Sequence, residues 1–233
     1  MKDKPYPLQI QTSTKRKSIG ISVYPNAIVK VFAPSGTLQS KIDEVIKSKE
    51  KWITDKIEHF KQSGSIEIKK KEYVSGESFY YLGKQYKLRI VDGKTTKIEL
   101  ARDTILLHKA SRSNIKNIIG KWFLDQAKEV FEERLKFNFE VFAKQYKYDF
   151  PTLKLRKMKS RWGSMSNKGN MTLNSHLIHT PVECIDYVIM HELCHLKYKN
   201  HSTRFYQLQF KLTPRYKELK NKLESFAVEI KLL

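Results

Sequence analysis

The sequence MHELCH at 190–195 contains residue types that can hold a metal ion and move protons. It places His191 and His195 four residues apart, with Glu192 directly after the first. On a helix, residues four apart lie about 40° apart around the axis, so the two imidazoles can bind one metal ion. Glu192 lies about 100° round from His191, where it can reach a metal-activated water without binding the metal. This is the His-Glu-x-x-His pattern typical of zinc peptidases.

The residue types of this segment fit hydrolysis. Neutral imidazoles leave zinc strongly Lewis acidic, and three protein ligands leave one position open for water and substrate. The metal lowers the pKa of that water to roughly 7, and Glu192 is expected to take its proton and pass it to the leaving amine. Burying the two histidines and the glutamate beside Val188, Ile189 and Leu193 without a metal would cost free energy. This favours a metal site over a surface helix with two solvated histidines.

The third ligand is expected to be His201. Five residues separate it from His195, so the helix must end and turn before His201 can come back to the metal. Asn200 is a common stop residue at helix C-termini, and Ser202 can cap the next helix. The alternative third ligand is a glutamate on the last helix, Glu218 or Glu224.

The first half of the chain is predicted to form strands and helices, and it contains no catalytic motif of its own. Two β-prone runs flank the turn signal Pro25-Asn26 in residues 18–33, which predicts a hairpin. Apolar residues three and four apart predict an amphipathic helix over 38–62, ended by Gly64. Further hairpins are predicted over 73–91, around Gly83-Lys84, and over 97–109, turning near Asp103.

The second half supplies the elements that must position the motif. A long helix is predicted from Ser113, its expected N-cap, to about residue 146. Strands are predicted over 153–158 and 171–178, with a glycine-bearing loop between them. Pro181 suits the first turn of the helix that carries the motif. Helical segments are expected from Ser202 and from Pro214. The order strand, loop, strand, helix predicts a motif helix lying against a small sheet.

Composition narrows the class of protein. The chain has 233 residues, 40% of them apolar, which suits a folded protein and excludes a wholly disordered one. No apolar run approaches the roughly 18 residues of a membrane span, and the N-terminus lacks a secretory signal pattern. Two cysteines make no disulfide framework, so a cytoplasmic setting is expected. The net charge of +21 has two readings. It indicates either a polyanion such as nucleic acid as a partner, or simply a well-solvated basic surface.

Beyond these patterns, the chain resembles the YgjP-like zinc metallopeptidases, relatives of the SprT/Spartan and WLM peptidases. The resemblance covers nearly the whole chain. The matching stretches are KRKSIGISVYPNAIVKVFAP (15–34), KSKEKWI (47–53), YLGKQYKL (81–88), MKSRWGSMS (158–166), NMTLNSHLI (170–178) and IDYVIMHELCHLKYKNHSTRFY (185–206). One departure is Met165, which stands where the family loop usually has a cysteine after Gly-Ser.

The resemblance implies that His191, His195 and His201 bind one zinc ion and that Glu192 is the catalytic base. It implies an α+β fold in which a zincin-like catalytic region, a small sheet plus the active-site helix, follows a strand-rich and helical N-terminal part. We expect residues 1–110 to bind substrate or shield the cleft. Residues 111–233 are expected to form the metallopeptidase region, with the long helix and the motif helix.

Other residues are candidates for the substrate cleft. Arg161 and Trp162, in the loop SRWGS, are expected either to line the cleft or to serve as a structural turn. The strand around Asn174 is a candidate for pairing with an extended peptide. Tyr206 or Arg204 is a candidate for stabilising the oxyanion that develops on the scissile carbonyl. His176 and His179 are expected to be strand residues rather than ligands.

The expected reaction is hydrolysis of peptide bonds in a protein or peptide substrate. Another zinc-dependent amide hydrolysis fits the same residues, since the same attack by water serves any amide. A protein-processing module associated with DNA is the alternative from another class, because relatives among the SprT/Spartan peptidases act on proteins bound to DNA. A scaffold with lost activity is disfavoured by the intact Glu192.

Overall fold

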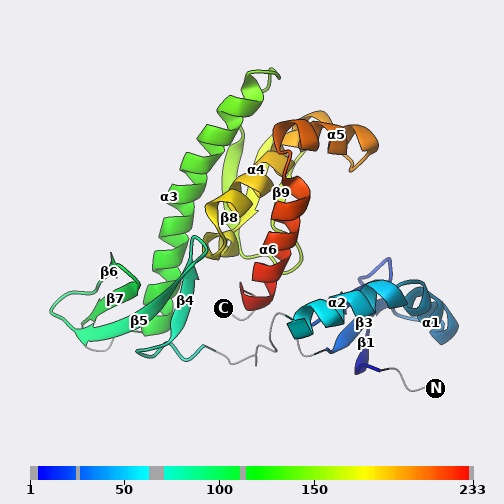
Figure 1. Cartoon of the computed structure of the whole chain (residues 1–233), viewed down its shortest axis with the longest axis horizontal. Helices are drawn as coiled ribbons and strands as arrows, with labels where there is room; N and C mark the ends of the chain where they lie inside the picture. Colours follow the sequence, from blue (N-terminus) through cyan, green and yellow to red (C-terminus); the bar gives the residue numbers. More distant parts are fainter. Residues whose placement is uncertain (1–4, 25–26, 63–70, 111–113, 231–233) are drawn as a thin grey trace. The chain divides into compact units, whose positions relative to one another are not determined.

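The chain divides into two compact units. The computed structural model describes residues 5–24, 27–62, 71–110 and 114–230, and the division between the units falls between residues 70 and 71 (Figure 1). The described residues form six α-helices and ten strands, which confirms the predicted α+β class. No helix in these ranges combines the length and apolarity that a bilayer crossing requires.

The N-terminal unit is a three-stranded sheet with two helices. Its elements are β1 (Leu8–Ser13), β2 (Gly20–Val23), β3 (Val29–Pro34), α1 (Gln39–Ser48) and α2 (Glu50–Gln62). Central strand β3 pairs antiparallel with β2, as the predicted hairpin requires, and parallel with β1, which the sequence did not predict. The turn residues Pro25-Asn26 and the stop residue Gly64 lie outside the described residues.

The predicted helix over 38–62 is two helices. The backbone of Lys49 leaves the helical region, with φ −110° and ψ 8°, so α1 ends and α2 begins beside it. Both helices still bury the apolar residues that the spacing selected. Ile42 and Ile46 from α1 and Ile53 from α2 pack in one core with strand β3, whose Val31 is wholly buried.

The second unit opens with a four-stranded sheet. Its strands are β4 (Ser78–Tyr81), β5 (Lys84–Asp92), β6 (Lys97–Ala101) and β7 (Thr104–Lys109), in the order β4-β5-β7-β6. The two predicted hairpins are confirmed, and the strands between them, β5 and β7, pair in parallel. Positive φ angles of 49° at Leu82 and 80° at Gly83 make the tight turn between β4 and β5. This sheet belongs to the same compact unit as the motif, so the observed division lies earlier than the one predicted at residue 110.

A smaller sheet follows in the second unit. It consists of β8 (Thr152–Arg156), β9 (Gly163–Met165) and β10 (Asn170–Asn174), in the order β8-β10-β9. Strand β9 lies in the segment predicted as a loop, and it pairs antiparallel with β10 at the edge of the sheet. The second predicted strand ends at Asn174, because residues Ser175–His179 form a 3-10 turn, η1.

Four helices complete the second unit. They are α3 (Ile115–Ala143), α4 (Val182–Lys197), α5 (Thr203–Leu212) and α6 (Tyr216–Ile230). Asn114 caps α3 by accepting a hydrogen bond from the Asn117 amide at 3.1 Å, and the predicted cap, Ser113, lies outside the described residues. Helix α4 follows Pro181, as predicted, and carries the His-Glu-x-x-His segment.

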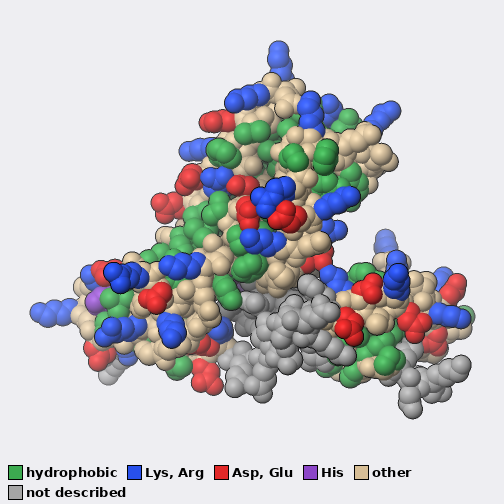
Figure 2. All heavy atoms as spheres, in the orientation of Figure 1, with side chains coloured by type: hydrophobic (Ala, Val, Ile, Leu, Met, Phe, Trp, Pro, Cys, Tyr) green, Lys and Arg blue, Asp and Glu red, His purple; other side chains and the backbone are tan. Residues whose placement is uncertain are grey.

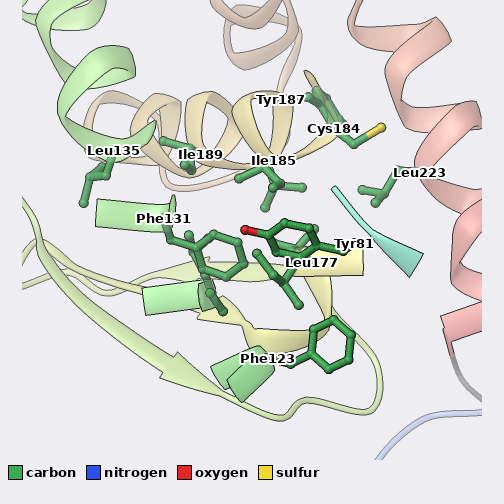
Figure 3. Close-up of a cluster of buried hydrophobic side chains, with 14 of the residues drawn as sticks. Tyr81, Phe123, Phe131, Leu135, Leu177, Cys184, Ile185, Tyr187, Ile189 and Leu223 are labelled. Carbon is green, nitrogen blue, oxygen red and sulfur yellow. The ribbon is translucent and has the colours of Figure 1, made fainter. Parts of the chain in front are cut away.

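Helix α4 is held by packing on several sides. Figure 3 shows Phe131 and Leu135 of α3 and Ile185 and Ile189 of α4 in one apolar cluster around Leu177. An ion pair with two hydrogen bonds, of 2.8 and 2.7 Å, joins Arg134 of α3 to Asp186 of α4. The motif helix is therefore packed into the core and joined to α3 by a polar contact.

Candidate metal centre

His191, Glu192 and His195 lie on α4, and His201 lies in the turn between α4 and α5. Helix α4 ends at Lys197, and Tyr198 is extended, with φ −123° and ψ 110°. The predicted stop at Asn200 is therefore wrong: the helix ends three residues earlier, and Asn200 has no positive φ. The predicted cap of α5 is confirmed, because the Ser202 hydroxyl accepts from the Phe205 amide at 3.4 Å.

The turn brings the three histidines to one point. One ring nitrogen from each of His191, His195 and His201 lies within 4.8 Å of the others. The Nε2 atoms of His191 and His201 are 2.9 Å apart. The ring of Phe205 packs against all three imidazoles, with centroid distances of 4.9, 4.6 and 4.8 Å, and so holds them together from the side of α5.

This donor set fits zinc. Imidazole binds metal only when a ring nitrogen is unprotonated, and burial lowers the pKa of His191 to about 3 and lowers that of His195 as well. The Nδ1 of His195 lies 2.9 Å from the Tyr198 carbonyl oxygen, which leaves its Nε2 free to face the metal. Ligands on a tetrahedral zinc lie about 3.3 Å apart when the Zn–N bonds are about 2.0 Å long. The 2.9 Å between the His191 and His201 nitrogens is slightly shorter than that spacing, and all three nitrogens lie within 4.8 Å of one another.

Glu192 lies deep in the site, with 5% of its surface exposed. Burial raises the pKa of its carboxyl to about 7, and the backbone amide of Met165 and the charge of Arg161 oppose that rise. Gly163 of β9 lies directly against it. A Cβ at position 163 would lie 2.6 Å from the carboxylate oxygen of Glu192. Strand β9 therefore fixes the carboxylate, and a side chain at Gly163 would displace it.

The three histidines and Glu192 line a cavity of about 950 Å³. Its other walls come from the segment around β9, from α5 and from α6. Of the predicted cleft residues, Arg161 and Trp162 line this cavity, and Asn174 does not. Of the two oxyanion candidates, Tyr206 lines the cavity and stacks on the His201 ring at a centroid distance of 6.1 Å, whereas Arg204 is not part of its lining.

Asn174 does not offer a free strand to a peptide. Its strand, β10, is the central one, paired with β8 on one side and β9 on the other. The Asn174 side chain is 4% exposed and donates hydrogen bonds to the carbonyl oxygens of Met158 and Arg161, at 2.8 and 3.0 Å. Asn174 thus anchors the segment that leads into β9. The edge strands of this sheet are β8 and β9, and of these two only β9 contributes residues to the cavity.

The glutamates considered as alternative third ligands lie outside the histidine group. Glu218 forms an ion pair with Arg215 at 2.6 Å and is not part of the cavity lining. Glu224 lines the cavity but does not belong to the group of converging ligand atoms. Cys194 is wholly buried in a cluster with Phe205 and Leu208, away from the histidine nitrogens.

The chain is similar to known metallopeptidases. A family model described as "YgjP-like, metallopeptidase domain" matches residues 17–226. The metallopeptidase zymogen abylysin of Pyrococcus abyssi is 26% identical, with a TM-score of 0.36 over 41% of this chain and 92% of that one. The metallopeptidase zymogen jannalysin of Methanocaldococcus jannaschii is 22% identical, with a TM-score of 0.34 over 43% of this chain and 96% of that one. No curated protein matches the chain.

Proposed function

Because the chain belongs to the YgjP-like metallopeptidase family, we propose that it hydrolyses peptide bonds of protein substrates with one zinc ion held by His191, His195 and His201. The observation that carries this proposal is the convergence of three imidazole nitrogens within 4.8 Å beside a buried glutamate, in a cavity of about 950 Å³. When bound, zinc supplies a Lewis acid that polarises the scissile carbonyl and makes water a better nucleophile at neutral pH.

Glu192 is the proposed general base. It takes a proton from the attacking water on its carboxylate and returns that proton to the leaving amine. Two features support this role. The carboxylate is fixed by the close approach of Gly163, and the pKa of about 7 that burial gives it suits proton exchange near neutral pH. Tyr206, which lines the cavity next to His201, is the better placed of the two candidates for stabilising the oxyanion.

Strand β9 is the proposed support for the substrate backbone. It lies at the edge of its sheet and pairs only with β10 among the described residues. Ser164 and Met165 of this strand line the cavity together with Glu192. An extended peptide that adds to this edge by backbone hydrogen bonds would pass directly beside the catalytic carboxylate.

Two further expectations stay predictions. Figure 2 shows Lys and Arg side chains spread over the visible face of the molecule with Asp and Glu among them, so no single basic patch on that face favours a nucleic-acid partner. The role expected for the N-terminal residues, substrate binding or shielding of the cleft, is also untested. We therefore rest the proposed function on the metal centre alone.

The test is cleavage of casein by zinc-loaded wild type and Glu192→Gln. We expect the substitution to leave zinc content unchanged and to reduce the rate by about 10²- to 10⁴-fold, since the variant cannot accept the proton. Glu132→Gln, the same change on the exposed face of α3, serves as the control and keeps full activity. Equal rates for Glu192→Gln and wild type, both loaded with zinc, would contradict the role of Glu192.

A further inference from the structure

The walls of the catalytic cavity are strongly basic. Apart from the histidines, its charged lining consists of four cations and two acids. The cations are Arg161, Lys199, Lys217 and Lys220, and the acids are the buried Glu192 and Glu224. Only Glu224 therefore opposes the four positive charges at the wall, because Glu192 lies at the bottom beside the histidines.

These four cations are available to a ligand. All four side chains are solvent-exposed, and none forms an ion pair with another described residue. The neighbouring cations of the same region differ in this respect. Arg215 pairs with Glu218 at 2.6 Å, and Lys222 pairs with Glu183 at 2.5 Å, and neither lines the cavity. The four cations of the cavity wall are thus unpaired, whereas two neighbouring cations outside the wall are neutralised by acids.

The cations approach the site from three segments. Arg161 precedes β9, Lys199 lies in the turn after α4, and Lys217 and Lys220 lie one turn apart on α6. Their fields reach the catalytic groups. Burial is the main cause of the pKa shifts of Glu192, His191 and His195. In addition, the charge of Arg161 acts on Glu192, that of Lys220 on His191 and that of Lys199 on His195. A substrate at the metal centre would therefore meet positive charge on more than one side.

We propose that this cleft selects peptides with aspartate or glutamate close to the scissile bond, an inference that rests on the proposed peptidase function. Exposed lysine and arginine side chains attract carboxylates weakly one at a time, but four unpaired cations around one cavity act together. Such attraction is screened by salt, because the cations are exposed to solvent. The preference is thus expected to be strong at low ionic strength and weak at high ionic strength.

The test compares two quenched fluorescent peptides that differ only in having Glu or Gln on both sides of the cleavage site. For wild type at about 20 mM salt we expect kcat/KM to be about 5- to 30-fold higher for the Glu peptide, falling towards equality near 0.5 M salt. Lys217→Gln/Lys220→Gln is expected to reduce that ratio severalfold. Lys168→Gln/Lys211→Gln removes the same charge from exposed positions that do not line the cavity, and it is expected to keep the wild-type ratio.

A binding assay separates failure of this preference from failure of the peptidase function. Labelled Glu and Gln peptides are titrated into zinc-loaded Glu192→Gln and followed by fluorescence anisotropy. Tighter binding of the Glu peptide supports the preference even where no cleavage is seen. Equal or weaker binding of the Glu peptide at low salt overturns it. Displacement of the Glu peptide by a DNA oligonucleotide at lower concentration than by unlabelled peptide also overturns it, because the basic walls would then serve nucleic acid.

A second inference concerns the side chain of Gln209 on α5. It is wholly buried, and among the described residues neither its amide nitrogen nor its amide oxygen has a hydrogen-bond partner of ordinary geometry. It lies one turn after Phe205, whose ring packs against His191 at 4.9 Å. The Gln209 amide is also close enough to the His191 ring to act on it as a hydrogen-bonding group.

The geometry points to Gln209 as the positioning residue for His191. Zinc-binding histidines commonly donate their second ring N–H to an oxygen, which sets the tautomer and the ring orientation. His195 has the Tyr198 carbonyl oxygen for this purpose, at 2.9 Å. Gln209 is in place to supply the corresponding oxygen to His191.

Zinc affinity by chelator competition tests this assignment. Gln209→Met keeps the size and removes the acceptor, and we expect the affinity to fall about 10- to 100-fold. Gln209→Glu keeps an acceptor oxygen and is expected to stay within about threefold of wild type. The exposed neighbour on the same helix, changed as Gln207→Met, is the control. A merely structural role predicts the reverse order, with the buried charge of Gln209→Glu as the worse change, and that result would overturn the assignment.

Discussion

Two groups of neighbouring histidines lie in the second unit, and they differ in what they can bind. His191, His195 and His201 converge on one point. His176 and His179 also lie close together, with ring centroids 6.0 Å apart, and burial lowers the pKa of each to about 4. Burial likewise lowers the pKa of His191 and of His195, so each group contains neutral imidazoles at neutral pH. A low pKa alone does not identify a metal site.

The difference lies in where the ring nitrogens point. The His179 Nδ1 lies 2.7 Å from the Tyr80 carbonyl oxygen, and its ring packs on Phe123 at a centroid distance of 4.5 Å. Nothing in the described residues adds a third donor to His176 and His179. The pair of His176 and His179 therefore shows the effect of burying imidazoles whose nitrogens do not converge on one point with a third donor. We expect this pair to contribute to stability and the converging group to bind the metal. The sequence predicted His176 and His179 to be strand residues and not ligands, but both lie in the 3-10 turn η1 and not in a strand.

The largest expected contrast comes from removing one histidine from each group. His191→Ala should lower zinc affinity by about 10²- to 10⁴-fold, since a binding free energy of about 10–16 kcal/mol is shared among three histidines. His179→Ala should leave zinc affinity unchanged and lower the free energy of unfolding of the zinc-free protein by about 1–3 kcal/mol. Chelator competition and urea unfolding measure the two quantities. A loss of zinc in His179→Ala would contradict the view that His176 and His179 take no part in metal binding.

The turn beside His179 gives the next largest effect. The amides of Leu82 and Gly83 donate to the carbonyl oxygens of Ile178 and His179, at 2.8 and 3.3 Å. In Gly83→Ala the new Cβ would lie 2.6 Å from the Pro181 Cγ and 2.9 Å from its backbone, at a φ of +80°. We expect a loss of about 2–3 kcal/mol in the free energy of unfolding, from backbone strain and overpacking together.

The control for this change is Gly76→Ala, which has a φ of +92° but nothing within 4 Å of the new Cβ. It should cost only about 1–2 kcal/mol, from the backbone conformation alone. Zinc affinity should stay within about threefold of wild type in both variants, because the turn supports the start of α4 and not the ligands. Equal losses of stability in the two variants would show that the contact with Pro181 does not matter.

A smaller effect is expected at the carboxylate of Glu192, the proposed general base. Gly163→Ala places a Cβ 2.6 Å from the Glu192 oxygen, so the carboxylate must move. We expect kcat/KM for casein to fall about 10-fold or more with zinc content unchanged, since a misplaced general base costs rate without loss of metal. Gly120→Ala on α3, where the new Cβ meets nothing within 4 Å, should keep full activity. Wild-type activity in Gly163→Ala would mean that β9 does not hold Glu192.

The sequence predicted the elements whose signals are local. Periodic apolar residues identified α3 and α4, and turn residues such as Gly83 identified the hairpins of the larger sheet. Strand β9 was missed because its three residues, Gly163–Met165, show neither alternation nor β-branching and are extended by pairing with β10. The parallel pairings of β1 with β3 and of β5 with β7 join distant segments and leave no local pattern.

The part of the site that lies on one helix was predictable, because the helical repeat fixes how its side chains are spaced around the axis. His191, Glu192 and His195 follow from the helical repeat, whereas the position of His201 depends on a turn that begins at Tyr198 and not at Asn200. Contacts between segments that are distant in sequence could not be predicted from the sequence. Gly163 against Glu192 and the buried amide of Gln209 beside the histidines become visible only when α4 lies beside β9 and α5.

The most direct test of the metal centre is zinc content by elemental analysis on wild type, His201→Ala and Glu224→Gln, each purified from zinc-replete medium and desalted. We predict one zinc per chain in wild type and in Glu224→Gln, and little or none in His201→Ala. One zinc in His201→Ala, held as tightly as in wild type, would contradict the three-histidine site, and loss of zinc in Glu224→Gln would move the third ligand to α6.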